Sequence, residues 1–116
     1  MAGISILHNE KNVKTFAAGE HIFEQGHIGN EMYGVLEGQV EIVLNGKVVE
    51  TVDDGGIFGE LAIIDTHIRS AAAVAKTNCR LAAIDQKRFT FLIQQTPYFA
   101  IQVMQVMADR LKRWGA

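Results

Sequence analysis

The sequence predicts a mainly β domain, a sandwich or barrel of short strands followed by two C-terminal helices. Ten of the eleven glycines lie before residue 60, and they divide that part of the chain into short segments typical of strands and turns. Turn signals recur there roughly every 8–12 residues, which favours a sandwich or barrel over a sheet with crossover helices. The stretch 60–114 contains no glycine, so it can hold longer helices.

Overall composition limits the classes of function. The chain has 116 residues, of which 48% are apolar, enough for one domain over residues 1–116 with one core. A net charge of -2 provides no basic surface, so we expect no nucleic-acid partner. The single Cys79 cannot form an internal disulfide, which suits a reducing compartment.

Targeting and membrane segments are not indicated. Residues 1–12 lack the basic and long apolar regions of a signal peptide. The apolar stretch 89–107 is interrupted by polar residues and Pro97, so it indicates two helices rather than a membrane span. We therefore expect a cytoplasmic protein with no membrane partner.

The first strands are predicted from short apolar segments bounded by turns. Residues 1–12 give a weak signal with two interpretations: Ile4, Ile6 and Leu7 dock as one helical turn, or the segment frays. Strands follow at residues 13–16, 21–23 and 32–36, with turns at 18–20, 24–26 and 29–30. All strands together should occupy about residues 13–84.

The clearest local signal is a β-hairpin over residues 39–52. Asn45-Gly46 lies between two apolar runs and favours a two-residue type I′ turn, because both turn positions need a positive φ. The expected register pairs Leu44 with Lys47, Val43 with Val48, and Ile42 with Val49. One face, the predicted interior, then carries Val40, Ile42, Leu44, Val49 and Thr51, and the other carries Glu41 and Glu50.

Two more strands complete the predicted roll, and a helix follows it. The strands are expected at residues 71–75 and 79–84 around a turn at 76–78. Asp85 is a suitable N-cap for a helix over about residues 86–95. That helix presents Phe89, Leu92 and Ile93 on one face.

The last helix is expected over about residues 97–114. Thr96 and Pro97 suit its N-cap and first position, and Gly115 ends it. Its apolar residues form a narrow seam with a period near 3.5, which fits either packing on its own barrel or self-association of two chains. The seam consists of Ala100, Val103, Met104, Met107, Leu111 and Trp114.

Residues 57–72 combine the groups that a buried anion site needs. Gly59 allows close approach of the backbone to a ligand, and a short helix at 60–64 offers free amides at its start. Arg69 can donate two hydrogen bonds to a phosphate, Ser70 adds a hydroxyl, and Glu60 can accept from a sugar hydroxyl. The alternative interpretation is a Glu60–Arg69 ion pair that closes a surface loop.

This stretch resembles the phosphate-binding cassette of cyclic-nucleotide-binding domains, the family of catabolite activators, kinase regulatory subunits and gated channels. The resemblance rests on Phe58-Gly59-Glu60-Leu61-Ala62 and Arg69-Ser70-Ala71, on the glycine-rich segments 16–26 and 32–38, and on the two helices. It implies a β-roll of the jelly-roll type with a short phosphate-binding helix and two C-terminal helices. Ile68 stands where the family often has proline, so the loop is less rigid.

The resemblance also implies roles for individual residues. Glu60 would accept from the ribose 2′-hydroxyl, Arg69 would pair with the cyclic phosphate, and Val49 would pack on base and sugar. The last helix would act as a lid, with Arg110, Leu111 and Trp114 within reach of the base. The binding residues implied at the phosphate end are Gly59, Leu61, Ala62, Ser70 and Ala71, and Phe58 directly before them is also an implied binding residue.

The implied function is a bacterial regulatory sensor, not an enzyme, that binds cAMP in preference to cGMP. Its lid helix would signal to a protein partner or to a second copy in a homodimer. No helix-turn-helix is expected after the lid. Trp114 could stack on the purine or pack on protein.

Two other functions remain as alternatives. A nucleotide-free interaction module could keep the same roll and assemble through its last helix. A cupin-like metal enzyme is disfavoured, because His8, His21, His27 and His67 contain no pair two residues apart. We therefore expect no bound metal. Cys79 has no base at a recognisable spacing, so we also expect no catalysis.

Overall fold

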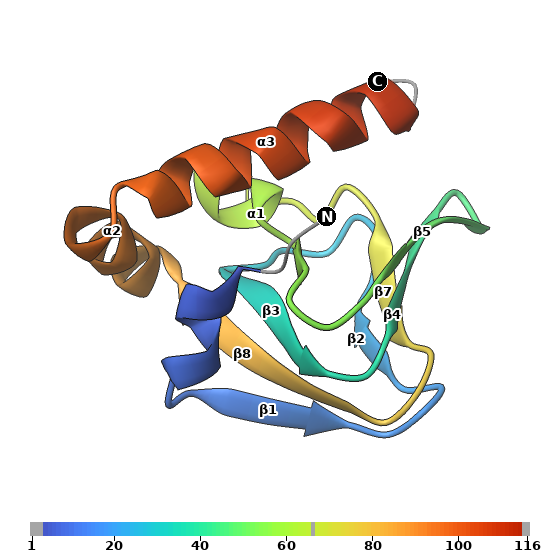
Figure 1. The fold of residues 1–116 in the computed structure, drawn as a ribbon. Coiled ribbons are helices and arrows are strands. Elements are labelled where there is room, and N and C mark those ends of the chain that lie inside the picture. Colours follow the sequence, from blue (N-terminus) through green and yellow to red (C-terminus); the bar gives the residue numbers. More distant parts are fainter. Residues whose placement is uncertain (1–3, 66, 115–116) are drawn as a thin grey trace.

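The structure is a computed structural model, and it describes residues 4–65 and 67–114. Eight strands and the helices follow one another along the chain (Figure 1). The strands are β1 (Val13–Phe16), β2 (His21–Phe23), β3 (Glu31–Glu37), β4 (Val40–Leu44), β5 (Lys47–Val52), β6 (Ile57–Phe58), β7 (Ala72–Ala75) and β8 (Cys79–Asp85). The helices are the 3-10 helix η1 (Ser5–Asn9) and the α-helices α1 (Leu61–Ile64), α2 (Gln86–Gln95) and α3 (Tyr98–Arg113).

The strands form two antiparallel sheets, in the orders β1-β8-β3-β6 and β2-β7-β4-β5. Their inner faces share one hydrophobic cluster, to which the first sheet contributes Val35 and Leu81 and the second Val40 and Ala73. The predicted roll with two C-terminal helices is confirmed. Figure 1 shows α3 lying across one end of this roll, with α1 beneath it.

The hairpin of β4 and β5 confirms the predicted turn but not the whole predicted register. Asn45 and Gly46 have φ of 51° and 80°, as a type I′ turn requires, and Val43 pairs with Val48. A bulge then lets Ile42 pair with Glu50 instead of Val49, because an extra residue shifts every later pair. The prediction was therefore wrong for two residues: Glu50 turns inward, and the exposed Thr51 pairs with Glu41.

A second hydrophobic cluster joins the N-terminal segment to the helices. Ile4 and Leu7 are buried beside Phe99 and Val103 of α3, which confirms the helical turn predicted near the N-terminus. Gly34 makes this docking possible, since a Cβ there would lie 2.5 Å from Leu7 Cδ1. The cluster therefore fixes α3 and η1 on the same side of the first sheet.

Helix α2 begins as predicted, because the Asp85 side chain accepts from the Arg88 amide at 2.8 Å. Leu92 is buried and Phe89 and Ile93 are partly buried against the second cluster, as expected for one apolar face. None of the helices in the described ranges is long and apolar enough to cross a membrane.

Helix α3 presents a different face to the core from the predicted seam. Its buried face carries Phe99, Val103, Val106 and Arg110. Met104 and Leu111 are 55% and 60% exposed, so the predicted seam is divided between two faces of the helix. The reason is that a 3.6-residue helix separates Val103 from Met104 by about 100°. The predicted end at Gly115 lies outside the described residues.

Candidate functional site

A cavity of about 260 Å³ lies between the roll, the segment 58–71 and α3. It brings together the predicted binding residues with the exception of Val49. That residue is the extra one at the β5 bulge, and it packs on the roll core instead. The lining consists of Phe23, Ile42, Phe58, Gly59, Glu60, Leu61, Ala62, Arg69, Ser70, Ala71, Met107, Ala108, Arg110, Leu111 and Trp114.

Arg69 places a buried cation in the wall of this cavity. The residue is 5% exposed, and its Nη1 donates to the Gly59 carbonyl at 3.1 Å. Its Nε is buried and has no hydrogen-bond partner. Burial lowers the pKa of Arg69, while Tyr33, Glu31 and Glu60 act in the opposite direction. A buried guanidinium with an unused donor is a site that an anion would complete.

Gly59 is required next to this guanidinium. Its φ is +79°, and a Cβ there would lie 2.8 Å from Arg69 Nη1. The residue after it, Glu60, forms the N-cap of α1 and is 4% exposed. The amides of Ile63 and Ile64 donate to the Glu60 carbonyl, whereas the amides of Leu61 and Ala62, two residues that line the cavity, belong to the first turn of α1 and have no acceptor within it.

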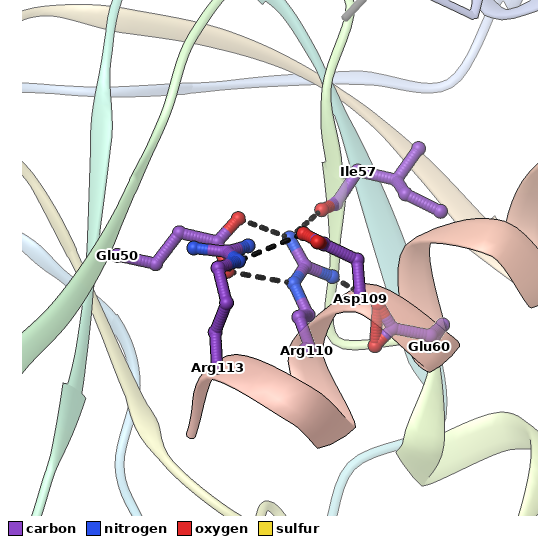
Figure 2. A network of polar contacts seen from close by, with 6 residues as sticks. All are labelled: Glu50, Ile57, Glu60, Asp109, Arg110 and Arg113. Atoms are coloured by element: carbon purple, nitrogen blue, oxygen red, sulfur yellow. Dashed lines mark hydrogen bonds and ion pairs between the residues drawn. The ribbon is translucent and has the colours of Figure 1, made fainter. Parts of the chain in front are cut away.

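The Glu60 carboxylate forms an ion pair with Arg110 of α3 (Figure 2). In the described part of the chain no ion pair joins Glu60 to Arg69, so the predicted surface pair does not form. Burial raises the pKa of Glu60, and Arg110 partly offsets that effect. The acid and the arginine of the segment thus lie in one cavity with separate partners.

Arg110 is the centre of a network that ties α3 to the roll. Its Nε and Nη2 donate to the two carboxylate oxygens of Glu50 at 2.9 and 3.0 Å, and Nη2 also donates to the Ile57 carbonyl. Arg113 pairs with Glu50 as well, at 3.0 Å (Figure 2). Burial alone would lower the pKa of Arg110, but Glu50 and Glu60 raise it above its ordinary value.

The remaining predicted residues lie at the rim or the end of the cavity. Ser70 is exposed, Ala71 is buried next to β7, and Leu111 is 60% exposed on α3. Trp114 packs against the roll core, yet its Nε1 is buried without a partner. In the described residues no group of three or more His, Cys, Asp or Glu side chains could hold a metal ion.

Four lining residues were not predicted as binding residues. Phe23 and Ile42 come from strands of the second sheet, while Met107 and Ala108 come from α3. Ile42 had been placed correctly on the interior face of the hairpin, and Met107 belonged to the predicted seam. Phe23 is the surprise, since nothing within its own short strand indicates that it contacts Arg69.

Comparison with known proteins gives a family match. The family model for the cyclic nucleotide-binding domain matches residues 13–96. A cAMP-dependent protein kinase regulatory subunit from Schizosaccharomyces pombe is 43% identical over 79 residues, 67% of this chain and 19% of that protein. A mouse potassium/sodium hyperpolarization-activated cyclic nucleotide-gated channel 2 is 30% identical over 112 residues, 97% of this chain and 13% of that protein. The chain thus spans less than a fifth of these curated relatives.

Solved structures give the same picture. The Thermus thermophilus catabolite activator protein superimposes with a TM-score of 0.82 at 26% identity, covering 97% of this chain and 55% of that one. A structure described as "A cyclic-GMP-dependent signalling pathway regulates bacterial phytopathogenesis" gives 0.73 at 29% identity, covering 85% and 82%. The likeness to the catabolite activator protein extends over nearly the whole chain, and so over both the roll and the helices.

Proposed function

The chain belongs to the cyclic nucleotide-binding domain family, and from this premise we propose that it binds cAMP in the cavity beside Arg69. The single observation that carries the proposal is that Arg69 and Glu60, two buried polar residues with separate partners, line the same largely apolar cavity. Arg69 offers an unused donor, and Glu60 offers carboxylate oxygens. A cyclic nucleotide has an anionic phosphate and a ribose hydroxyl at a short, fixed separation, and these two groups match that pair.

The phosphate would bind at Arg69. The guanidinium supplies charge, the Leu61 and Ala62 amides supply neutral donors, and Ser70 supplies a hydroxyl at the rim. Gly59 leaves room for the phosphate to approach the backbone. Charge-assisted hydrogen bonds in a site of this burial are stronger than in water, so this end should supply most of the affinity.

The ribose would bind at Glu60. Arg110 occupies one carboxylate oxygen, Oε1, and a carboxylate can accept several hydrogen bonds. Glu60 can therefore accept from the 2′-hydroxyl without releasing α3. This arrangement makes the ligand a bridge between the roll and the last helix, which is how we propose that binding is sensed.

Preference for cAMP over cGMP follows from the groups around the base. The donors of Arg110 are engaged with Glu50, Glu60 and the Ile57 carbonyl. The other lining residues of α3 are Met107, Ala108 and Leu111, whose side chains offer no hydrogen bond to a base edge. Guanine carries one more exocyclic polar group than adenine, and burying it unpaired against these residues costs free energy. Trp114 would stack on the purine, as well as packing on the roll.

The signal would leave through α3. A ligand shifts this helix only if it binds the closed arrangement better than the open one. The face of α3 away from the core exposes Ile101, Met104 and Leu111, which would contact a partner protein or a second copy of the chain.

The test is isothermal titration calorimetry on purified protein that has been stripped of nucleotide. We expect binding of cAMP with micromolar or better affinity and weaker binding of cGMP. Absence of heat and of any thermal shift with both nucleotides would favour the alternative, an interaction module of the same fold that works through α3. Equal affinity for the two nucleotides would contradict only the preference.

A further inference from the structure

We propose that Phe23 is a positioning residue for anion recognition, which holds the Arg69 guanidinium in place before any ligand arrives. The inference rests on the proposed function, because it assigns Arg69 to the phosphate. Phe23 ends β2, some 46 positions before Arg69 in the sequence.

The ring and the guanidinium are in direct contact. Arg69 Cζ lies 3.9 Å from the centroid of the Phe23 ring, well within the range of a cation–π interaction. The ring is itself fixed by two aromatic neighbours. Its centroid lies 6.1 Å from that of Tyr33 and 5.9 Å from that of Phe58, and those two rings stack at 5.3 Å.

Gly29 completes the slot around the guanidinium. A Cβ on Gly29 would lie 2.1 Å from Arg69 Nε and 2.4 Å from Cζ, so the bare backbone of Gly29 rests against the same group. The two loops that carry these residues are joined by backbone hydrogen bonds. Arg69 N donates to His27 O and Gly29 N donates to His67 O, each at 2.8 Å.

The carboxylates nearby are engaged elsewhere. Glu31 accepts from Lys14 at 2.8 Å and from the Tyr33 hydroxyl at 3.0 Å, and Glu60 pairs with Arg110. Within the described residues Arg69 forms no ion pair, and the one hydrogen bond of its side chain is to the Gly59 carbonyl.

This choice of partner matters for function. A carboxylate would hold the arginine by neutralising it and by using its donors, whereas an aromatic face holds the cation and leaves both the charge and the in-plane N–H groups free. Phe23 therefore allows a buried arginine to be ordered and still unsatisfied. That is the state in which an incoming phosphate gains most, because no existing pair has to be broken.

The experiment compares Phe23→Leu with the conservative variant Phe23→Tyr. Calorimetry with cAMP should show an affinity about 3- to 30-fold lower for Phe23→Leu, the range of one cation–π contact, and an affinity near that of the unmodified protein for Phe23→Tyr. Adenosine, which lacks the phosphate, is titrated by NMR and should bind both variants as it binds the unmodified protein.

A second measurement needs no ligand. In ¹⁵N-labelled protein without nucleotide, the Arg69 Nε–H signal should be displaced upfield by the ring current of Phe23. Its assignment comes from its loss in Arg69→Lys. The displacement should persist in Phe23→Tyr and become much smaller in Phe23→Leu, where the more distant Tyr33 ring remains, 5.8 Å from Arg69 Cζ.

Any of three results would overturn the inference. The first is an equal loss of adenosine and cAMP affinity in Phe23→Leu, because the ring would then contact only the nucleoside. The others are an unchanged cAMP affinity in Phe23→Leu and an Arg69 Nε–H signal without upfield displacement in the unmodified protein. If the unmodified protein binds neither cAMP nor cGMP, the proposed function fails. The Nε–H signal of the ligand-free protein still decides whether Phe23 holds Arg69.

Discussion

At the scale of single residues, Arg69 is a buried cation held by an aromatic ring and a carbonyl rather than by a carboxylate. Arg69→Ala should therefore weaken cAMP binding by roughly 2–5 kcal/mol, since a buried phosphate loses its charged partner. The fold should tolerate the change, because no buried carboxylate is left unpaired. Calorimetry and thermal unfolding on the same sample measure both effects.

The matched control for this variant is Arg80→Ala. Arg80 pairs with Glu37 on the surface, with a side chain that is 49% exposed, and it does not line the cavity. Its removal should leave nucleotide affinity unchanged. An Arg69→Ala protein that keeps its affinity for cAMP would contradict the role assigned to the guanidinium.

Tyr33, beneath the Arg69 slot, gives a prediction for alkaline pH. Burial, and then the charge and hydrogen bond of Glu31, raise the pKa of Tyr33 from 10.0 to about 12. Because the pKa is higher in the folded protein, the neutral phenol stabilises the fold fully below about pH 10. This contribution is lost as the pH rises from about 10 to about 12. Absorbance titration of a Tyr98→Phe variant, which retains only Tyr33, should show one ionisation near 12 while the protein is folded.

The residue scale also shows what a motif can predict. The motif of glycine, acid, arginine and serine at fixed spacing predicts most of the residues that line the cavity, because they come from one segment of the sequence. The contact between Phe23 and Arg69 could not be predicted from a motif. It depends on the pairing of β2 with β7, which brings distant segments of the sequence together.

At the scale of elements, the β5 bulge and α3 are coupled through Glu50. Without the extra residue, Glu50 would point outward with Glu41, as the simple alternation predicts; with it, the carboxylate reaches Arg110. The Asn-Gly turn is local and therefore predictable. The bulge is not, because nothing in the alternation of β5 reveals a partner sixty positions further along the chain.

Glu50→Gln should loosen the end of α3. The substitution removes one charge from the network around the buried Arg110 and leaves that arginine with weaker acceptors, at a cost of roughly 1–3 kcal/mol in unfolding free energy. Amides near residues 110–114 should exchange with deuterium faster in the ligand-free variant. The control is Glu41→Gln on the neighbouring strand, which should exchange like the unmodified protein. Unchanged protection of α3 in Glu50→Gln would contradict the coupling.

At the scale of the whole molecule, two separate hydrophobic clusters stabilise different parts of the fold. One lies between the sheets and supports the cavity, and the other joins η1, the first sheet and the helices. The division into a roll and two helices could be predicted, because glycine content and helical periodicity change along the chain. The partition of strands into two sheets could not, since β7 and β8 are consecutive yet belong to different sheets.

Leu7 tests whether the second cluster supports the whole fold. It is 2% exposed and packs on Gly34, and the same cluster holds Phe99 and Val103 of α3. Leu7→Ala should lower the free energy of unfolding by about 2–5 kcal/mol, the usual cost of a buried leucine, with an unchanged urea m-value. Leu111→Ala is the control, because that side chain is 60% exposed and should change stability by about 0.5 kcal/mol or less. A small effect of Leu7→Ala would mean that η1 detaches without loosening α3, and the N-terminal segment would then be an addition to the fold rather than part of its support.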